Sequence, residues 1–247
     1  MATSRTTVQS ISDYNRETKF TYELRESRLK KCVRIIDRLP RGRMLDVGCS
    51  TGDWGALWQG KGWKCSGIDI DRAHAEIARS RGIDARYCDL TRDPLPFEDQ
   101  SFDLIFAGEV IEHLVDTDAF LQELHRCLRP GGSVLITTPN LASFENRVRL
   151  VLGMYPIWLN YSLAGSGHVR GYTARILRKQ LYDHGFRVSV QKGNWVPFIP
   201  QHFTDDIKVP WLAITGDLLP SLSMDIIMLA ERVELRSPNL SENSHRG

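Results

Sequence analysis

Short apolar runs alternate with amphipathic segments between residues 43 and 139, and this alternation restricts the possible folds more than any other feature of the chain. The apolar runs are "RMLDVG", "CSGIDI", "DARYCDL", "FDLIFAG" and "SVLITTP". Helical patterns separate most of them: "WGALWQGKG", "AHAEIARSRG" and "TDAFLQELHRCLRPGG". Strands that alternate with helices form βαβ units, in which the strands are parallel and the crossovers right-handed. The sequence therefore predicts an α/β fold built on a parallel sheet.

The alternation ends after Asn140, and the remaining elements follow a different order. A helix is predicted in "TARILRKQLYDHGF", and two final strands in "RVSVQKG" and "MDIIMLAERVE", which we expect to pair as a hairpin-like edge. The sheet then has seven strands and is mostly parallel, with an antiparallel last strand. We divide the chain into an N-terminal helical lid (1–40), a core (41–141), a cap with the last strands of the same sheet (142–236) and a disordered tail (237–247).

Charge and cysteine content exclude several classes of protein. Among 247 residues, 32 Lys and Arg balance 30 Asp and Glu, and a net charge of +2 argues against a nucleic-acid partner. The five cysteines form no C-x-x-C pair, which indicates reduced thiols and a cytoplasmic location. The polar N-terminus lacks the apolar stretch of a signal peptide, and no apolar run reaches the ~18 residues that span a bilayer.

A glycine-rich stretch, "LDVGCSTGDWG", follows the first predicted strand. Glycines at a turn from strand to helix let the backbone approach a ligand, and the helix N-terminus offers free N–H groups. The spacing differs from the G-x-G-x-x-G of a pyrophosphate site, and an acid, Asp46, precedes the glycines. Because an acid repels phosphate, this loop favours a cationic or hydroxyl-rich ligand.

Five blocks in order carry a resemblance to a known family: "LDVGCSTG", "GIDI", "CDL", "LPFEDQSFDLIFAGEVIEHL" and "LRPGGSVLITTPN". In this combination the chain resembles the class I S-adenosylmethionine-dependent methyltransferases, over about residues 44–186. The resemblance implies a Rossmann-like three-layer sandwich whose core binds S-adenosylmethionine and releases S-adenosylhomocysteine. The cofactor-binding residues that it implies are Asp46, Gly48, Ser50, Gly52, Asp69, Ile70, Asp89, Leu90 and Glu109.

The resemblance also implies a part of the cofactor for most of these residues. The glycine loop lines the methionine part, with Asp46 near its amino end. Asp69, which ends the second predicted strand, takes the ribose hydroxyls; Asp89 with the backbone of Leu90 takes the adenine, beside Ile70. One position departs from the family pattern, because serine stands at 50 where the family usually has glycine. We expect Ser50 to fit if its φ angle is negative.

The stretch "EVIEHL" places two carboxylates and a histidine directly after the fourth predicted strand. Glu109, Glu112 and His113 are spaced i, i+3 and i+4, so one helical turn would put all three on one face. Methyl transfer to a hydroxyl requires an oriented acceptor and a base or metal near the methyl group. His113 and a later histidine, His168, are the candidate catalytic bases.

Three roles stay open for this group: the catalytic base described above, a metal ligand, and a cofactor contact or structural role. The layout is similar to the quinone-biosynthesis O-methyltransferases and to the small-RNA 2′-O-methyltransferases, in which matching Glu and His residues hold a divalent ion. Carried over, Glu109, Glu112, His113 and His168 suit Mg²⁺ or Mn²⁺. Similar strings also occur in methyltransferases without metal, so we assign no metal ligand. The third role is a cofactor contact or a structural one.

The sequence says less about the methyl acceptor than about the cofactor site. The chain has no [DN]-P-P-[YFW] segment, which disfavours N-methylation of bases, and two aromatic segments, 144–161 and 195–211, are candidate walls for an apolar small molecule. We expect O-methylation of a hydroxyl or carboxyl by a monomer or homodimer. The alternative functions are an activator of another enzyme and a metal-dependent RNA 2′-O-methyltransferase. Separately, Trp195, Phe198, Trp211 and Leu218 are candidates for a peripheral membrane contact.

Overall fold

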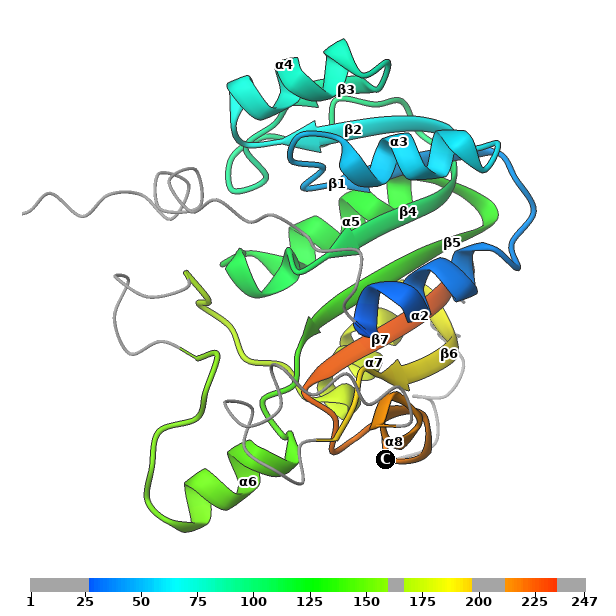
Figure 1. Ribbon diagram of the computed structural model, residues 1–247. Helices are drawn as coiled ribbons and strands as arrows, with labels where there is room; N and C mark the ends of the chain where they lie inside the picture. The colour runs from blue at the N-terminus through cyan, green and yellow to red at the C-terminus, as the bar shows by residue number, and fades with distance from the viewer. Residues whose placement is uncertain (1–26, 160–166, 197–211, 235–247) are drawn as a thin grey trace, which may run out of the picture.

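One seven-stranded sheet organises the part of the chain that the computed structural model describes, residues 27–159, 167–196 and 212–234 (Figure 1). Its strands are β1 (Arg43–Val47), β2 (Lys64–Asp69), β3 (Asp84–Tyr87), β4 (Phe102–Gly108), β5 (Leu128–Pro139), β6 (Phe186–Gly193) and β7 (Asp225–Arg232). They lie in the order β3-β2-β1-β4-β5-β7-β6. The predicted α/β sandwich with a mostly parallel sheet is confirmed.

Strand β7 is the antiparallel member of the sheet, and it lies between β5 and β6. The expected pairing of the last two strands at one end of the sheet is confirmed, with β6 outermost and β7 between β6 and β5. The burial of the two strands explains this order. Five consecutive residues of β7, 226–230, are buried, as a central strand requires, whereas β6 exposes or half-exposes most of its length.

Helices cover both faces of the sheet (Figure 1). They are α2 (Ser27–Ile36), α3 (Asp53–Gly60), α4 (Arg72–Ser80), η1 (Ile111–His113), α5 (Thr117–Cys127), α6 (Phe144–Val151), α7 (Ala174–Asp183) and α8 (Leu212–Leu218). Two buried clusters define the layers: α2, α3 and α4 contribute to one, and α5 and α7 to the other. Successive strand residues alternate between them, as Leu104 and Ile105 of β4 do. None of the helices in the described ranges is long and apolar enough to cross a membrane.

Side chains at the helix starts satisfy backbone N–H groups that have no partner within the helix. Asp116 accepts a hydrogen bond from Ala119 N at 2.9 Å and so caps α5. The other end of α5 differs from expectation. The chain passes from Cys127 straight into β5, and Gly131, with a φ of 75°, lies in the irregular start of that strand, where the pairing with β4 shifts.

Helix α2 packs across the sheet near β7, and a buried lysine of this helix forms hydrogen bonds with other elements. Lys31 Nζ lies 2.6 Å, 2.9 Å and 2.5 Å from the carbonyl oxygens of Gly193, Asn194 and Ala213. It also lies 2.8 Å from Asp217 Oδ1. One ammonium group therefore joins α2 to the end of β6 and to α8. Of the predicted lid, residues 1–26 lie outside the described residues, as does the predicted tail 237–247.

Candidate active site

The carboxyl ends of the central strands meet at one edge of the sheet and bring the predicted site residues together. Val47 pairs with Ile68 and with Ala107, and Ala107 in turn pairs with Ile136. The residues that follow these positions on β1, β2, β4 and β5 therefore share the edge. Ligands of open α/β sheets bind outside the carboxyl ends of the strands.

The glycine loop connects β1 to α3 through three residues in the left-handed region: Gly48, Ser50 and Gly52 have φ angles of 74°, 47° and 81°. A Cβ atom on Gly48 would lie 3.1 Å from Val110 Cγ2, and one on Gly52 would lie 2.9 Å from Ala78 Cβ. Both the φ angle and the lack of space favour glycine at these two positions. The contact with Val110 also shows that the loop lies against the turn after β4.

Ser50 does not meet the condition set by the sequence, because its φ angle is positive. A non-glycine residue in this region carries about 1 kcal/mol of strain. The backbone N–H of Ser50 donates to Asp69 Oδ2 at 2.7 Å, and this bond holds the loop in place. The serine is accommodated by its link to Asp69 rather than by a relaxed backbone.

Asp46 presents a buried carboxylate oxygen to the base of the glycine loop. Its side chain is buried, and Oδ2 has no hydrogen-bond partner among the described residues. Burial, and secondarily the charge of Asp69, raises the pKa of Asp46 to about 8. A buried unpaired acceptor is costly, and a cationic amino group would pair with it. Asp46 therefore fits the amino end of an amino-acid ligand.

Asp69 ends β2 and is held by two backbone donors, Ser50 N at 2.7 Å and Asp71 N at 2.8 Å. Burial raises its pKa above the ordinary value, although these hydrogen bonds act in the opposite direction. Each carboxylate oxygen keeps a second lone pair, so both can still accept from vicinal hydroxyls. Asp69 thus combines a structural role in the loop with the capacity to bind a ribose.

Asp89 lies after β3 and is buried. Its Oδ1 accepts from the backbone N of Thr91 at 3.0 Å and from Thr91 Oγ1 at 2.7 Å, while Arg92 Nε lies 3.7 Å from Oδ2. Leu90 packs against the core cluster beneath it, and Ile70 is half-buried just beyond β2. The residues predicted for the adenine therefore follow β2 and β3, the two strands on the side of β1 away from β4.

Glu109 is separated from the rest of "EVIEHL". It precedes η1 with a φ angle of 57°, so the expected single helical turn does not include it. Thr137 Oγ1 donates to its Oε1 at 2.8 Å, and Arg28 of α2 forms an ion pair with the same oxygen. Glu109 thus joins α2 to the edge of β4 and β5.

Glu112, His113 and His168 form a compact cluster beside this edge. One ligand atom from each lies within 4.8 Å of the others, and the two imidazole rings meet edge to face with centroids 4.8 Å apart. Glu112 Oε2 accepts from Thr138 Oγ1 at 3.0 Å, while its Oε1 is buried with no partner among the described residues. The backbone brings His168 here, because Val169 N donates to the carbonyl oxygen of Glu112 at 2.9 Å.

The hydrogen bonds of the two histidines fix their tautomers. His113 Nδ1 lies 3.2 Å from the carbonyl oxygen of Gly167, and His168 Nδ1 lies 2.6 Å from that of Trp158. Because a carbonyl oxygen only accepts, each Nδ1 carries the hydrogen and each Nε2 keeps a lone pair.

Burial disfavours the charged forms of the side chains in this cluster. Burial, with a smaller contribution from His168, lowers the pKa of His113 to about 4, and burial also lowers the pKa of His168. Burial, followed by the charge of Glu109, raises the pKa of Glu112 well above its ordinary range. Two neutral imidazoles at neutral pH can accept a proton from a substrate or ligate a metal.

Sequence reasoning missed the residues that orient these groups. Thr137 and Thr138 at the end of β5 each hold one glutamate, and their signal was the strand end "TTP" opposite "EVIEHL". Arg28 and the carbonyl oxygen of Trp158 had no such signal. Both reach the site from distant parts of the chain.

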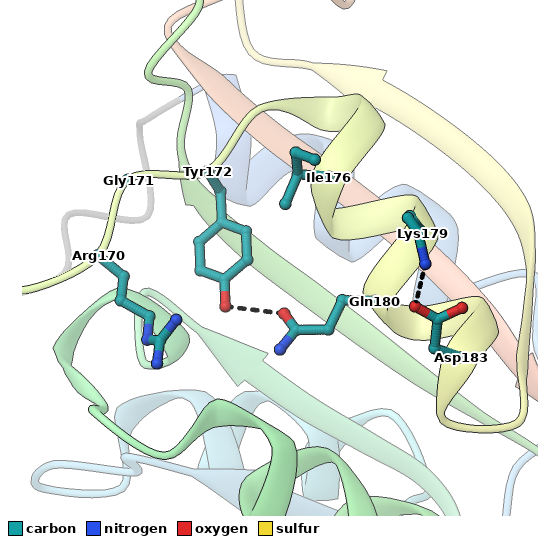
Figure 2. Close-up of a pocket in the computed structure, with 7 residues that line it drawn as sticks. All are labelled: Arg170, Gly171, Tyr172, Ile176, Lys179, Gln180 and Asp183. Carbon is teal, nitrogen blue, oxygen red and sulfur yellow. Dashed lines mark hydrogen bonds and ion pairs between the residues drawn. The ribbon is translucent and has the colours of Figure 1, made fainter.

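A cavity of about 380 Å³ lies between residues 170–172, which follow His168, and helix α7. Figure 2 shows its lining between Arg170 and α7, with the ring of Tyr172 pointing toward Gln180. Tyr172 Oη donates to Gln180 Oε1 at 2.9 Å, and Gln180 Nε2 donates to Thr117 Oγ1 at 2.8 Å. Because these polar groups satisfy one another, the cavity offers less to a ligand than the cluster at the sheet edge.

Known proteins share this sequence and architecture. The family model described as a methyltransferase domain matches residues 23–191. A malonyl-[acyl-carrier protein] O-methyltransferase of Serratia marcescens is 34% identical over 43% of this chain and 42% of its own length. A ubiquinone biosynthesis O-methyltransferase of Chelativorans sp. (strain BNC1) is 30% identical over 49% and 47%. The chain thus spans about half the length of the curated relatives it matches.

The fold is also found among solved structures. A SAM-dependent methyltransferase from Thermotoga maritima, described as a possible histamine N-methyltransferase, superimposes with a TM-score of 0.59 at 20% identity, covering 84% of this chain and 90% of that one. At this identity the likeness concerns the fold alone. Because the family model covers more than half of the chain, the protein belongs to the methyltransferase domain family, and its fold is that of the class I members.

Proposed function

We propose that this protein transfers a methyl group from S-adenosylmethionine to an oxygen atom, a hydroxyl or carboxyl, of a small-molecule acceptor. The observation that carries the proposal is the pair of neutral imidazoles of His113 and His168, which follow the turn that the glycine loop contacts at Val110. The two O-methyltransferases matched above, named for malonyl-[acyl-carrier protein] and for ubiquinone biosynthesis, support an oxygen acceptor.

The glycine loop and its acids fit the cofactor. When bound, S-adenosylmethionine supplies an electrophilic methyl group on a sulfonium, so the protein needs no further activation of the donor. Asp46 Oδ2 would pair with the amino group, Gly48, Ser50 and Gly52 would face the methionine part, and Asp69 would accept from the ribose hydroxyls. Asp89, with Leu90 and Ile70 beside it, would hold the adenine, and Glu109 would line the same edge.

The histidines would then deal with the acceptor proton. A hydroxyl placed at His113 Nε2 or His168 Nε2 would give its proton to that nitrogen as the oxygen attacks the methyl carbon. The Nδ1 hydrogen bonds to Gly167 and Trp158 keep each ring oriented while Nε2 gains charge. An acceptor carboxylate is already deprotonated and would need only orientation.

The proposal is tested with S-adenosylmethionine labelled in its methyl group and a panel of catechols, hydroxybenzoates and dicarboxylic thioesters. The expected result is label in an ether or ester product, located by mass spectrometry, together with S-adenosylhomocysteine. Label on nitrogen or carbon, with hydroxyl and carboxyl compounds inert, would sink the assignment of an oxygen acceptor.

A divalent cation at Glu112, His113 and His168 is a second candidate, favoured by the unpartnered Oε1 of Glu112. Ligands opposite each other around Mg²⁺ lie about 4 Å apart, so a set of atoms within 4.8 Å suits such an ion after a small contraction. Carboxylate and imidazole ligands together favour Mn²⁺ over Mg²⁺. The ion would polarise the acceptor oxygen, and the histidines would serve as ligands instead of bases.

Chelation distinguishes the two candidates. If the histidines act as bases, dialysis against EDTA leaves methyl transfer unchanged. If they hold a metal, EDTA abolishes transfer and Mn²⁺ restores it. Glu112→Gln separates them further, because it removes a metal ligand but retains both imidazoles.

A further inference from the structure

The apolar side chains that the fold leaves exposed are concentrated on one segment. Among the described residues, half of the exposed large hydrophobic side chains lie within residues 148–158, which we name the α6 tip. They are Val148, Leu150, Val151, Leu152, Met154, Tyr155 and Trp158. Val151 and Leu152 are the most exposed of them, at 86% and 67%. A contiguous exposed apolar patch marks a surface that docks on something.

The α6 tip is a closed loop with a polar base. At its base the buried Asn146 bridges the two arms, since its Oδ1 accepts from Ile157 N at 2.8 Å. At its far end Arg149 Nε donates to the carbonyl oxygen of Tyr155 at 2.9 Å, which holds the turn. Figure 1 shows α6 standing away from the sheet at the lower end of the view. A projecting loop that is held by these hydrogen bonds and has an apolar end has the shape of an element that inserts rather than one that receives a ligand.

Its charges indicate what it would insert into. The α6 tip contains Arg149 and no acidic residue, and the exposed Arg147 directly precedes it. Arginines beside aliphatic residues, with Tyr155 and Trp158 at the return arm, match an interface where anionic headgroups overlie acyl chains. A second copy of this tip fits less well, because it offers no acidic side chain to pair with the arginines of the first copy.

We infer that the α6 tip docks this protein on an anionic lipid surface by inserting its apolar end at the headgroup boundary. The inference does not rest on the proposed function. It moves the membrane contact expected from sequence to a different segment: Phe198 and Trp211 lie outside the described residues, Trp195 is half-buried, and Leu218 is exposed on α8. The tip also returns directly to the catalytic candidates, because the carbonyl oxygen of Trp158 accepts from His168.

Vesicle flotation tests the inference. The full chain is mixed with vesicles of phosphatidylcholine alone or with added phosphatidylglycerol. We expect binding to the anionic vesicles and weaker binding to the neutral ones. The double variant Val151→Glu with Leu152→Glu should bind at least about tenfold more weakly, because each buried aliphatic side chain alone accounts for about that factor.

The matched control places the same charges on another exposed apolar pair. Ile176→Glu with Tyr182→Glu changes two α7 side chains that are 52% and 72% exposed, and its vesicle binding should stay within about twofold of wild type. Affinity for S-adenosylhomocysteine, measured by calorimetry, should be equal in all three proteins and so shows that the variants are folded.

Three outcomes overturn the inference: no binding of the wild type to either vesicle, equal losses in the tip and α7 variants, or a wild-type dimer that the tip variant converts to a monomer while neither binds vesicles. Vesicle binding without methyl transfer to any oxygen acceptor would leave the inference standing and remove the proposed function instead.

Discussion

Ser50 of the glycine loop and Asp46 just before the loop both carry an energetic cost in the ligand-free protein. Ser50 adopts a left-handed backbone that glycine would adopt without strain, and Asp46 keeps a buried oxygen without a partner among the described residues. Both features raise the free energy of the ligand-free protein. Strain and unpaired buried groups of this kind concentrate at functional sites.

Replacing Ser50 with glycine should stabilise the protein. Glycine removes about 1 kcal/mol of left-handed strain, partly offset by the larger entropy of the unfolded chain, so the free energy of unfolding should rise by about 0.5 kcal/mol. Urea denaturation of Ser50→Gly measures this, with Thr51→Gly as a neighbouring control that should not stabilise. A decrease for Ser50→Gly would show that the serine makes a contact that outweighs the strain.

Binding of S-adenosylhomocysteine should release a proton from Asp46. With its pKa raised to about 8, Asp46 is protonated at pH 7 in the ligand-free protein, and the amino group of the ligand favours the ionised form. Calorimetry at pH 7 in buffers of different ionisation enthalpy should show release of up to about one proton. The release should be absent in Asp46→Asn, and a wild type that releases none would contradict the assignment.

The same shift has a consequence for stability. Because the folded-state pKa of Asp46 lies above its ordinary value of 3.8, its contribution to stability is present at acidic pH. This contribution is lost as the pH rises toward 8. The ligand-free protein should therefore gain more stability from Asp46→Asn at pH 8 than at pH 4.

At the scale of elements, helix α2 depends on Lys31. Its ammonium group serves three carbonyl oxygens and Asp217, so Lys31→Met would leave these acceptors unsatisfied in a buried place. The free energy of unfolding should fall by about 3 kcal/mol. Lys30→Met, at the exposed neighbouring position, should change it by less than about 0.5 kcal/mol, and equal effects in urea denaturation would refute the role of Lys31.

Helices and strands could be predicted from the sequence wherever their apolar residues recur with one clear period. The five strands up to Pro139 and helix α7 lie where the apolar pattern predicts, because each one buries a face of fixed period. The pairing of β7 with β6 was predicted, but its pairing with β5 was not, since that contact depends on the order of the whole sheet. The short η1 turn could not be predicted either, since its three residues carry no periodic signal.

For the candidate site, the sequence likewise predicted the positions of residues along the strands but not their contacts. Order along the chain placed Asp46, Asp69 and Asp89 at strand ends, and the structure has them there. The sign of φ at Ser50 and the partners of Glu112 depended on packing between elements distant in sequence. Local patterns carry no information about such contacts.

At the scale of the whole molecule, the glycine loop, the histidine cluster and the α6 tip all follow strands at the same edge of the sheet, where the strands have their carboxyl ends. β5 ends beside Thr137 and Thr138, which hold the glutamates, and the chain then runs into α6 and returns through Trp158 to His168. A lipid surface met by the tip would thus lie on the side from which an apolar acceptor reaches the cluster. Donor, base and source of acceptor would share one edge.

The most direct test of this account is turnover of labelled S-adenosylmethionine by His113→Ala and His168→Ala, with an oxygen acceptor found in the panel. The account predicts that at least one variant loses about 100-fold or more in kcat while its affinity for S-adenosylhomocysteine stays at the wild-type value. Full turnover in both variants, with normal affinity for S-adenosylhomocysteine, would contradict the assignment of a histidine base.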